Sequence, residues 1–144
     1  MIRQLSVFVE NQPGSIMRVT SALTEAQINI RAISSFDAPE FAILRLVVDK
    51  PEEAKDALTT KGFVVRLQDV ISVELKDEQG SLNEMLKVLA DNGNGINYIY
   101  SFVIRGEKAP VMVFSTDDTE KAVQVLEKEH VKVAVSYTHL TLPT

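Results

Sequence analysis

Apolar and polar residues alternate near the start of the chain, and the period then changes. Leu5, Val7 and Val9 recur at every second position, which predicts a half-buried β-strand. After a Pro-Gly pair, apolar residues recur at the spacing of one helix face, at Ile16, Val19, Leu23 and Ala26. This part of the chain therefore predicts a strand, a turn and an amphipathic helix.

Two further strands are predicted after this helix. Apolar residues alternate again over residues 28–32, and a more continuous apolar run, "FAILRLVV", covers residues 41–48. A continuous apolar run is typical of a central strand that is covered on both faces.

A second helix is predicted over the segment "DKPEEAKDALTTKG", residues 49–62. Asp49 with Glu52 three positions later matches a capping box, Pro51 suits a first helical turn, and Gly62 suits a helix end. The apolar run at residues 63–67 then predicts a fourth strand, so the order of elements is βαββαβ.

The same pattern occurs twice in the chain. "INI" at residues 28–30 returns as "INY" 68 positions later, and Asp49 and Glu52 return at the same spacing. Gly14 and Ser15 return only 66 positions later, as Gly80 and Ser81. We interpret this as a duplication in which the second copy gained two residues within "DNGNG", residues 91–95. Its elements are predicted from a strand at 69–75 to alternating valines at 131–135.

The predicted fold class is α+β. Right-handed crossovers in a βαββαβ unit place both helices on one face of a four-stranded antiparallel sheet, which is the ferredoxin-like sandwich. We expect one domain over residues 1–67 and a second over 68–136. We also expect the two copies to pair into a larger antiparallel sheet with helices on one face, because a unit of this size is marginal alone. Residues 137–144 are interpreted as a non-native tail.

The segment "VENQPGSIMRVTSALTEAQINI" resembles the first half of an ACT domain, a small regulatory βαββαβ module that binds amino acids. In that family a strand leads into Asn or Asp, two residues, then Gly and a helix, and an Asn follows at the start of the second strand. The first copy matches at Asn11, Pro13, Gly14 and Asn29, and the second at Asp77, Gly80 and Asn97, with Gln79 in the place of Pro13.

The resemblance implies a site for a free amino acid. Backbone N–H groups at a helix start can receive a carboxylate, and a side-chain oxygen of Asn11 or Asp77 can accept from an ammonium group. By the family's side-by-side pairing, Asn11 would share a site with Asn97, and Asp77 with Asn29. The expected ligand-binding residues are Asn11, Gly14, Ser15, Ile16, Asn29, Asp77, Gln79, Gly80, Ser81, Leu82 and Asn97. Ordinary turn chemistry remains an alternative for Asn11, Asn29 and Asn97.

Composition narrows the function classes. The chain of 144 residues carries 15 Lys and Arg against 20 Asp and Glu, a net charge of −5, and its basic residues are spread out, so no nucleic-acid partner is expected. It has no Cys and only two His, which makes a nucleophile with its base, or a metal cluster, hard to assemble. His130 is interpreted as a solvated partner of a helix dipole. We expect no catalytic residue, metal or cofactor.

The sequence therefore predicts a non-catalytic regulatory protein that binds a small amino acid at the interface between two ACT-like domains. We expect a homodimer whose signal is received by a metabolic enzyme or regulator. The alternatives are a regulatory subunit of an amino-acid biosynthetic enzyme, similar to acetolactate synthase small subunits, and a nucleic-acid-binding βαββαβ module. Because no apolar run reaches the about 20 residues of a membrane span and no signal-peptide pattern is present, we expect a cytoplasmic protein without a membrane partner.

Overall fold

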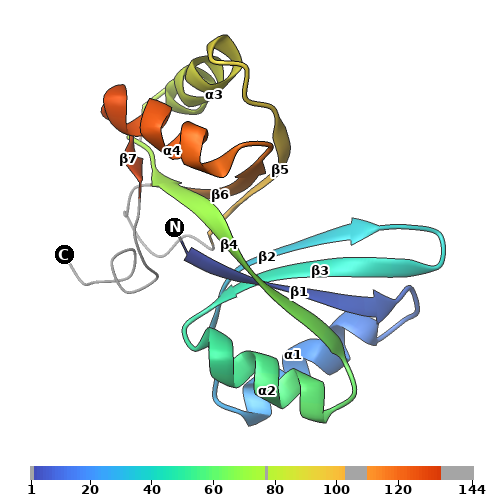
Figure 1. The fold of residues 1–144 in the computed structure, drawn as a ribbon. Coiled ribbons are helices and arrows are strands. Elements are labelled where there is room, and N and C mark those ends of the chain that lie inside the picture. Colours follow the sequence, from blue (N-terminus) through green and yellow to red (C-terminus); the bar gives the residue numbers. More distant parts are fainter. Residues whose placement is uncertain (1, 77, 103–109, 134–144) are drawn as a thin grey trace. The chain divides into compact units, whose positions relative to one another are not determined.

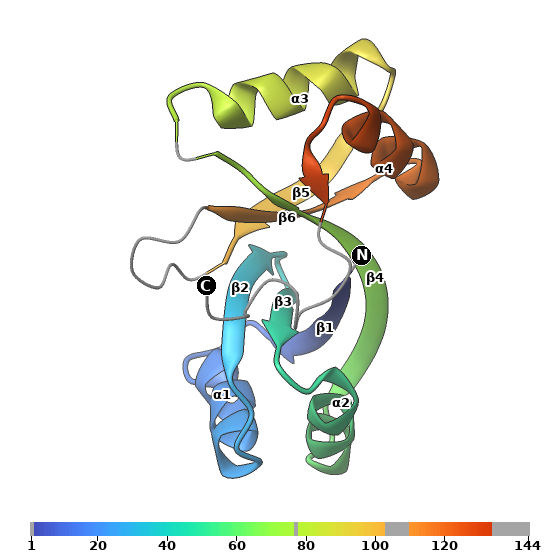
Figure 2. The same cartoon turned by 90° about the vertical axis from the view of Figure 1, so that its left-hand side faces the viewer.

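The computed structural model describes residues 2–76, 78–102 and 110–133 (Figures 1 and 2). The chain divides into two compact units, of which one is formed by Arg3–Asp69 and the other chiefly by the described residues from Val70 onward. We call them copy 1 and copy 2 and describe each by itself. Asp77 and the segment that we interpreted as a tail lie outside the described residues, as does Val135.

Copy 1 has the ferredoxin-like order that its sequence predicts. Its elements are β1 (Ile2–Glu10), α1 (Ser15–Glu25), β2 (Ile30–Asp37), β3 (Phe41–Val48), α2 (Pro51–Thr60) and the first part of β4 (Val64–Glu74). The strand order is β2-β3-β1-β4, and β3 runs antiparallel to both β1 and β2. Helices α1 and α2 lie side by side on one face of this sheet (Figure 1).

Copy 2 repeats this arrangement. It consists of the rest of β4, α3 (Ser81–Asp91), β5 (Ile96–Ser101), β6 (Val111–Thr116), α4 (Thr119–Lys128) and β7 (Lys132–Val133). The strand order is β5-β6-β4-β7, which corresponds to β2-β3-β1-β4 of copy 1, and neighbouring strands are again antiparallel. The α+β class and the βαββαβ order are thus confirmed in each copy.

One strand serves both copies, which differs from our prediction. We expected separate strands at residues 63–67 and 69–75, whereas β4 runs without interruption from Val64 to Glu74. The residues at the expected break, Gln68 and Asp69, include neither the Gly nor the Pro that would mark a turn, so the chain stays extended.

The repeat is also aligned differently from our prediction. The helix-end residues with positive φ, Gln27 (60°) in copy 1 and Gly93 (75°) in copy 2, are 66 positions apart. The bulge after Ile30 in β2 returns after Ile96 in β5 at the same spacing. The spacing changes to 68 only at β6, so the extra two residues lie between β5 and β6. The match of "INI" with "INY" is therefore wrong by two positions, and Asn97 is equivalent to Arg31.

The predicted cap of α2 is also wrong. The residue before the helix is Lys50, and no side chain caps the helix start. Asp49 instead joins β3 to the start of β2, because its Oδ1 accepts from the Asn29 N–H at 3.0 Å and its own N–H donates to the Asn29 carbonyl at 3.2 Å. In copy 2 the residue after the Asp49 equivalent, Asp118, caps α4 by accepting from the Lys121 N–H at 3.1 Å.

Each copy has its own apolar core between sheet and helices. Copy 1 buries Leu5, Val7, Leu23, Leu44, Leu46 and Leu58, and copy 2 buries Ile71, Met85, Leu89, Phe114 and Leu126. The cores differ at one end, where Ile28 and Val48 of copy 1 correspond to Asn94 and Thr116 of copy 2. Asn94 and Thr116 are each only 6 % exposed, and Asn94 Nδ2 and Thr116 Oγ1 have no hydrogen-bond partner among the described residues.

A reciprocal pair of substitutions tests this difference. Thr116→Val removes a buried hydroxyl without a partner and should raise the free energy of unfolding by about 1 kcal/mol. Val48→Thr places a hydroxyl at the equivalent site of copy 1 and should lower it by about 1–3 kcal/mol. Urea unfolding followed by circular dichroism measures both. A loss of stability in Thr116→Val would show that the hydroxyl is satisfied in solution.

Candidate functional site

The turn between β1 and α1 is built around a left-handed glycine. Gly14 stands at the helix N-cap with φ +85°, and no side chain caps the helix. The turn closes when the Ser15 N–H donates to the Gln12 carbonyl at 3.1 Å, and the Arg18 N–H donates to the Gly14 carbonyl at 3.0 Å. A Cβ at Gly14 would meet no atom within 4 Å, so the space beside this glycine is open.

Copy 2 builds the same turn from a different sequence. Gly80 has φ +89°, and again no side chain of the described residues caps the helix, here α3. The Ser81 N–H donates to the Glu78 carbonyl at 3.2 Å, and the Glu84 N–H to the Gly80 carbonyl at 2.9 Å. Gln79 replaces Pro13 without changing this geometry, so the glycine and not the proline is the shared requirement.

The backbone amides expected to receive a carboxylate differ in whether they already donate a hydrogen bond. Because the Ser15 and Ser81 N–H groups donate within their own turns, the predicted role falls on the other amides of the helix start. Ser15 is 2 % exposed, and its hydroxyl accepts from Arg18 Nη2 at 3.2 Å. The side chains of Ile16 and Leu82 are exposed, as is that of Met17.

Asn11 has a partner that the sequence did not indicate. Its Nδ2 donates to Asp37 Oδ1 at 2.6 Å, which links the turn after β1 to the end of β2. Both side chains are exposed. Asp37 follows no spacing motif, and only the parallel course of β1 and β2, set by their shared neighbour β3, brings it here.

The predicted Asn residues of the second strands lie at the other end of their copies. Ile30 pairs with Val48, whereas Glu10, next to the turn, pairs with Phe41, so Asn29 and Gly14 are at opposite ends of β3. Asn97 lies at the start of β5, and its Nδ2 donates to Ser115 Oγ at 3.4 Å. Neither Asn shares a site with the glycine turn of its own copy, and the expected sharing between copies stays a prediction.

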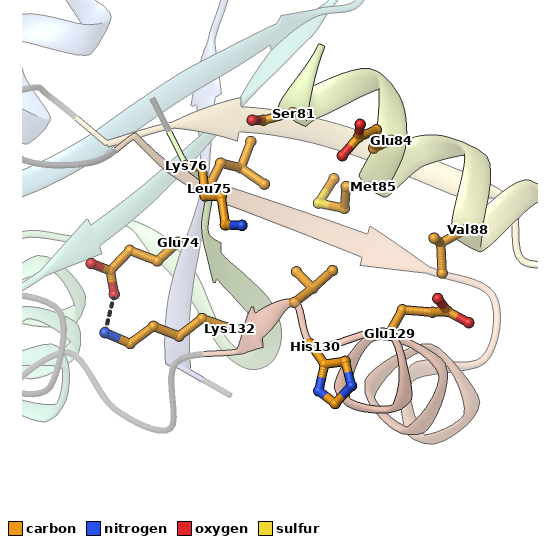
Figure 3. A pocket seen from close by; sticks show the side chains of 11 residues that line it. Glu74, Leu75, Lys76, Ser81, Glu84, Met85, Val88, Glu129, His130 and Lys132 are labelled. Carbon is orange, nitrogen blue, oxygen red and sulfur yellow. Dashed lines mark ion pairs between the residues drawn. The ribbon is translucent and has the colours of Figure 1, made fainter. Parts of the chain in front are cut away.

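A pocket of about 530 Å³ opens beside α3 in copy 2 (Figure 3). Its walls come from the end of β4, from α3, and from the segment that joins α4 to β7. Of the predicted site residues that the structure describes, only Ser81 lines it. Sequence reasoning treated His130 as a solvated residue, and the structure places it at the edge of this pocket with φ 63°, in the helix-end position that Gly62 occupies in copy 1.

No group of three or more His, Cys, Asp or Glu among the described residues could hold a metal ion. None of the helices in the described part of the chain has the length and apolar character needed to span a membrane.

Comparison with known proteins assigns the family. The profile of the family described as "ACT domain pair" matches residues 1–140. The chain therefore belongs to the ACT domain pair family, and the resemblance seen in the sequence is confirmed. No curated protein matches the chain.

Solved structures share this fold. Protein BT0572 from Bacteroides thetaiotaomicron is 29 % identical, with a TM-score of 0.88 over 98 % of this chain and 96 % of that one. The ligand-free regulatory subunit of aspartate kinase from Thermus thermophilus is 22 % identical, with a TM-score of 0.61 over 88 % and 91 %. The corresponding subunit from Thermus flavus is 21 % identical, with a TM-score of 0.57 over 89 % and 92 %.

Substitution of the turn glycines tests the geometry of the helix starts. Gly14→Ala and Gly80→Ala should each lower the free energy of unfolding by about 1–2 kcal/mol, because a Cβ disfavours the left-handed conformation. Gly14→Asn is the matched control and should lower it less, because Asn adopts this conformation more readily. Chemical unfolding of the three variants measures the effect. If Ala were as stable as Gly, the left-handed turn would not be the solution conformation.

Proposed function

We propose that this ACT domain pair is a non-catalytic regulatory protein that binds a small free amino acid. The observation that carries the proposal is the repeated helix start, in which a left-handed glycine precedes a helix without a side-chain cap in both copies. Family membership supports a regulatory role, and the resemblance to ACT domains implies the binding of an amino acid.

The helix starts suit the carboxylate of an amino acid. The first N–H groups of a helix lack intrahelical acceptors and lie at the positive end of the helix dipole. With the Ser15 and Ser81 amides committed to their turns, Gly14 and Ile16 in copy 1, and Gly80 and Leu82 in copy 2, supply the donors. The open space at both glycines lets the carboxylate approach the backbone.

The ammonium group needs acceptors, and copy 1 offers them beside the turn. The Asn11 Nδ2 group donates to Asp37, which leaves the side-chain oxygen of Asn11, Oδ1, to accept a hydrogen bond from a ligand. The Asp37 carboxylate adds a negative charge at the same place. We infer that Asn11 and Asp37 hold the ammonium group together, while Asp77 takes this role in copy 2. Asn29 and Asn97, which are not equivalent positions of the two copies, would reach a glycine turn only in another copy.

Ligand binding would regulate by changing the population of two arrangements. A ligand held by groups of two ACT domains favours the arrangement in which those groups meet, and its effect is limited by its difference in affinity for the two states. The domains could belong to one chain or to the two chains of a homodimer. A partner enzyme or regulator would receive the signal.

A second candidate is a regulatory subunit of an amino-acid biosynthetic enzyme. The observation that favours it is the likeness in fold to regulatory subunits of aspartate kinase, which extends over about nine-tenths of both chains. Under this proposal the catalytic chain of such an enzyme is the partner.

A thermal-shift screen of the twenty amino acids tests the proposed function. One or a few should raise the melting temperature, because a ligand selective for the folded state adds RT ln(1 + [L]/Kd) to its stability. Asn11→Ala should weaken binding by about 1–3 kcal/mol by removing a charge-assisted hydrogen bond. The matched control is Gln124→Ala, which removes an exposed amide side chain from α4. The proposal fails if no amino acid changes the melting temperature at millimolar concentration.

A further inference from the structure

The pocket beside α3 has an apolar floor and a charged rim. The floor includes Met85, which is only 1 % exposed, together with Leu75, Val88 and Val131. The charged and polar lining consists of Glu74, Lys76, Ser81, Glu84, Glu129, His130 and Lys132. Figure 3 shows these groups around Met85, with Glu84 on α3 and Glu129 at the end of α4.

Copy 1 provides an internal comparison, because the same backbone positions carry other residues there. Equivalent residues of the two copies are 66 positions apart around the start of the first helix, and 68 positions apart around the end of the second helix. Three charges are reversed between the copies: Glu10 becomes Lys76, Arg18 becomes Glu84, and Lys61 becomes Glu129. A common backbone has therefore received the opposite pattern of charge at this place.

The two copies also differ in how these charges are satisfied. In copy 1 the Arg18 guanidinium donates to Ser15, and Lys61 Nζ lies 3.2 Å from Glu25 Oε2. In copy 2 the ion pair found within the described lining joins Lys132 Nζ to Glu74 Oε2 at 2.9 Å. The carboxylates of Glu84 and Glu129 are in no ion pair or hydrogen bond with a described residue.

The lining favours a cation. Glu74 and Lys132 neutralise one another, so the lining has two further carboxylates, Glu84 and Glu129 on different walls, and its other basic side chains are Lys76 and His130. The volume lies within the range of small-molecule pockets, which combine apolar walls with a few polar groups that fix orientation. A group of three acids or histidines suited to a metal was not found among the described residues, so an organic cation fits better than a metal ion.

We propose that this pocket binds a small molecule with an ammonium group and a compact aliphatic body. The ammonium group is held by Glu84 and Glu129, and the aliphatic body lies on Met85, Val88 and Val131. This chemistry is shared by aliphatic amines and by free amino acids with apolar side chains. The proposal is independent of the proposed function, since it uses no amide of the glycine turns.

The four methionines provide reporters for a direct test. Protein labelled with 13C at the methionine methyl groups is titrated with 3-methylbutylamine, and the Met85 methyl signal should shift in a saturable manner. Met17 on α1 is 64 % exposed, lies three residues after Gly14, and reports on the turn of copy 1. A ligand of the copy 1 turn moves Met17. A ligand of the pocket moves Met85 and binds more weakly in Glu129→Gln, a position outside both glycine turns, so the two proposals can fail separately.

Variants assign the ammonium contact. Glu84→Gln and Glu129→Gln should each weaken the binding of 3-methylbutylamine by about tenfold, because each removes one partner of a charge-assisted hydrogen bond. Both residues are exposed, so their substitution leaves the core intact. Glu127→Gln, also exposed on α4 but outside the pocket lining, is the matched control and should leave binding unchanged.

Two further probes separate the sources of the ligand chemistry. If the pocket serves amino acids, L-leucine binds more tightly than 3-methylbutylamine, and Lys76→Gln removes this advantage; if it serves simple amines, the amine binds at least as tightly. 4-Methylpentanoate, which has the aliphatic body without the ammonium group, should leave Met85 unmoved. The proposal is overturned if the Met85 signal stays constant with both ammonium compounds, or if 4-methylpentanoate binds as well as they do.

Discussion

The left-handed glycine at the start of α1 and of α3 is the constraint on which the candidate site depends. A residue at φ +85° or +89° turns the chain from a strand into a helix within a few residues. It also places the N–H group of the next residue so that it donates a hydrogen bond to a carbonyl of the turn. The helix start then has no capping side chain among the described residues, and the space beside each glycine is open. A side-chain cap would satisfy the same amides and remove the site.

The sequence predicted the elements of each copy because the apolar period changes cleanly between strand and helix, as at Val9 and Ile16. Tertiary pairing decided what local patterns could not. Asp49 looks like a helix cap, but the strand pairing offers it the Asn29 backbone instead. The repeat was misaligned because "INI" and "INY" are alike by letters, whereas the left-handed position shared by Gln27 and Gly93 is set by geometry.

The candidate site also contains residues that the sequence could predict and residues that it could not. Gly14 and Gly80 could be predicted because only glycine adopts their conformation without strain, and the turn recurs. Asp37 could not be predicted, since its contact with Asn11 depends on which strands share β3 as a neighbour. The pocket of copy 2 was missed because Glu84 and Glu129 are exposed acids 45 positions apart, and nothing local joins them.

The most direct test of the account is whether a bound amino acid contacts the helix-start amides. In uniformly 15N-labelled protein, titration with an amino acid that raises the melting temperature should shift the backbone amide signals of Gly14 and Ile16, or of Gly80 and Leu82, more than those of the α2 and α4 interiors. Hydrogen bonds to a carboxylate change the environment of the donor N–H directly. Saturation of binding with these four amide signals unchanged would contradict the account.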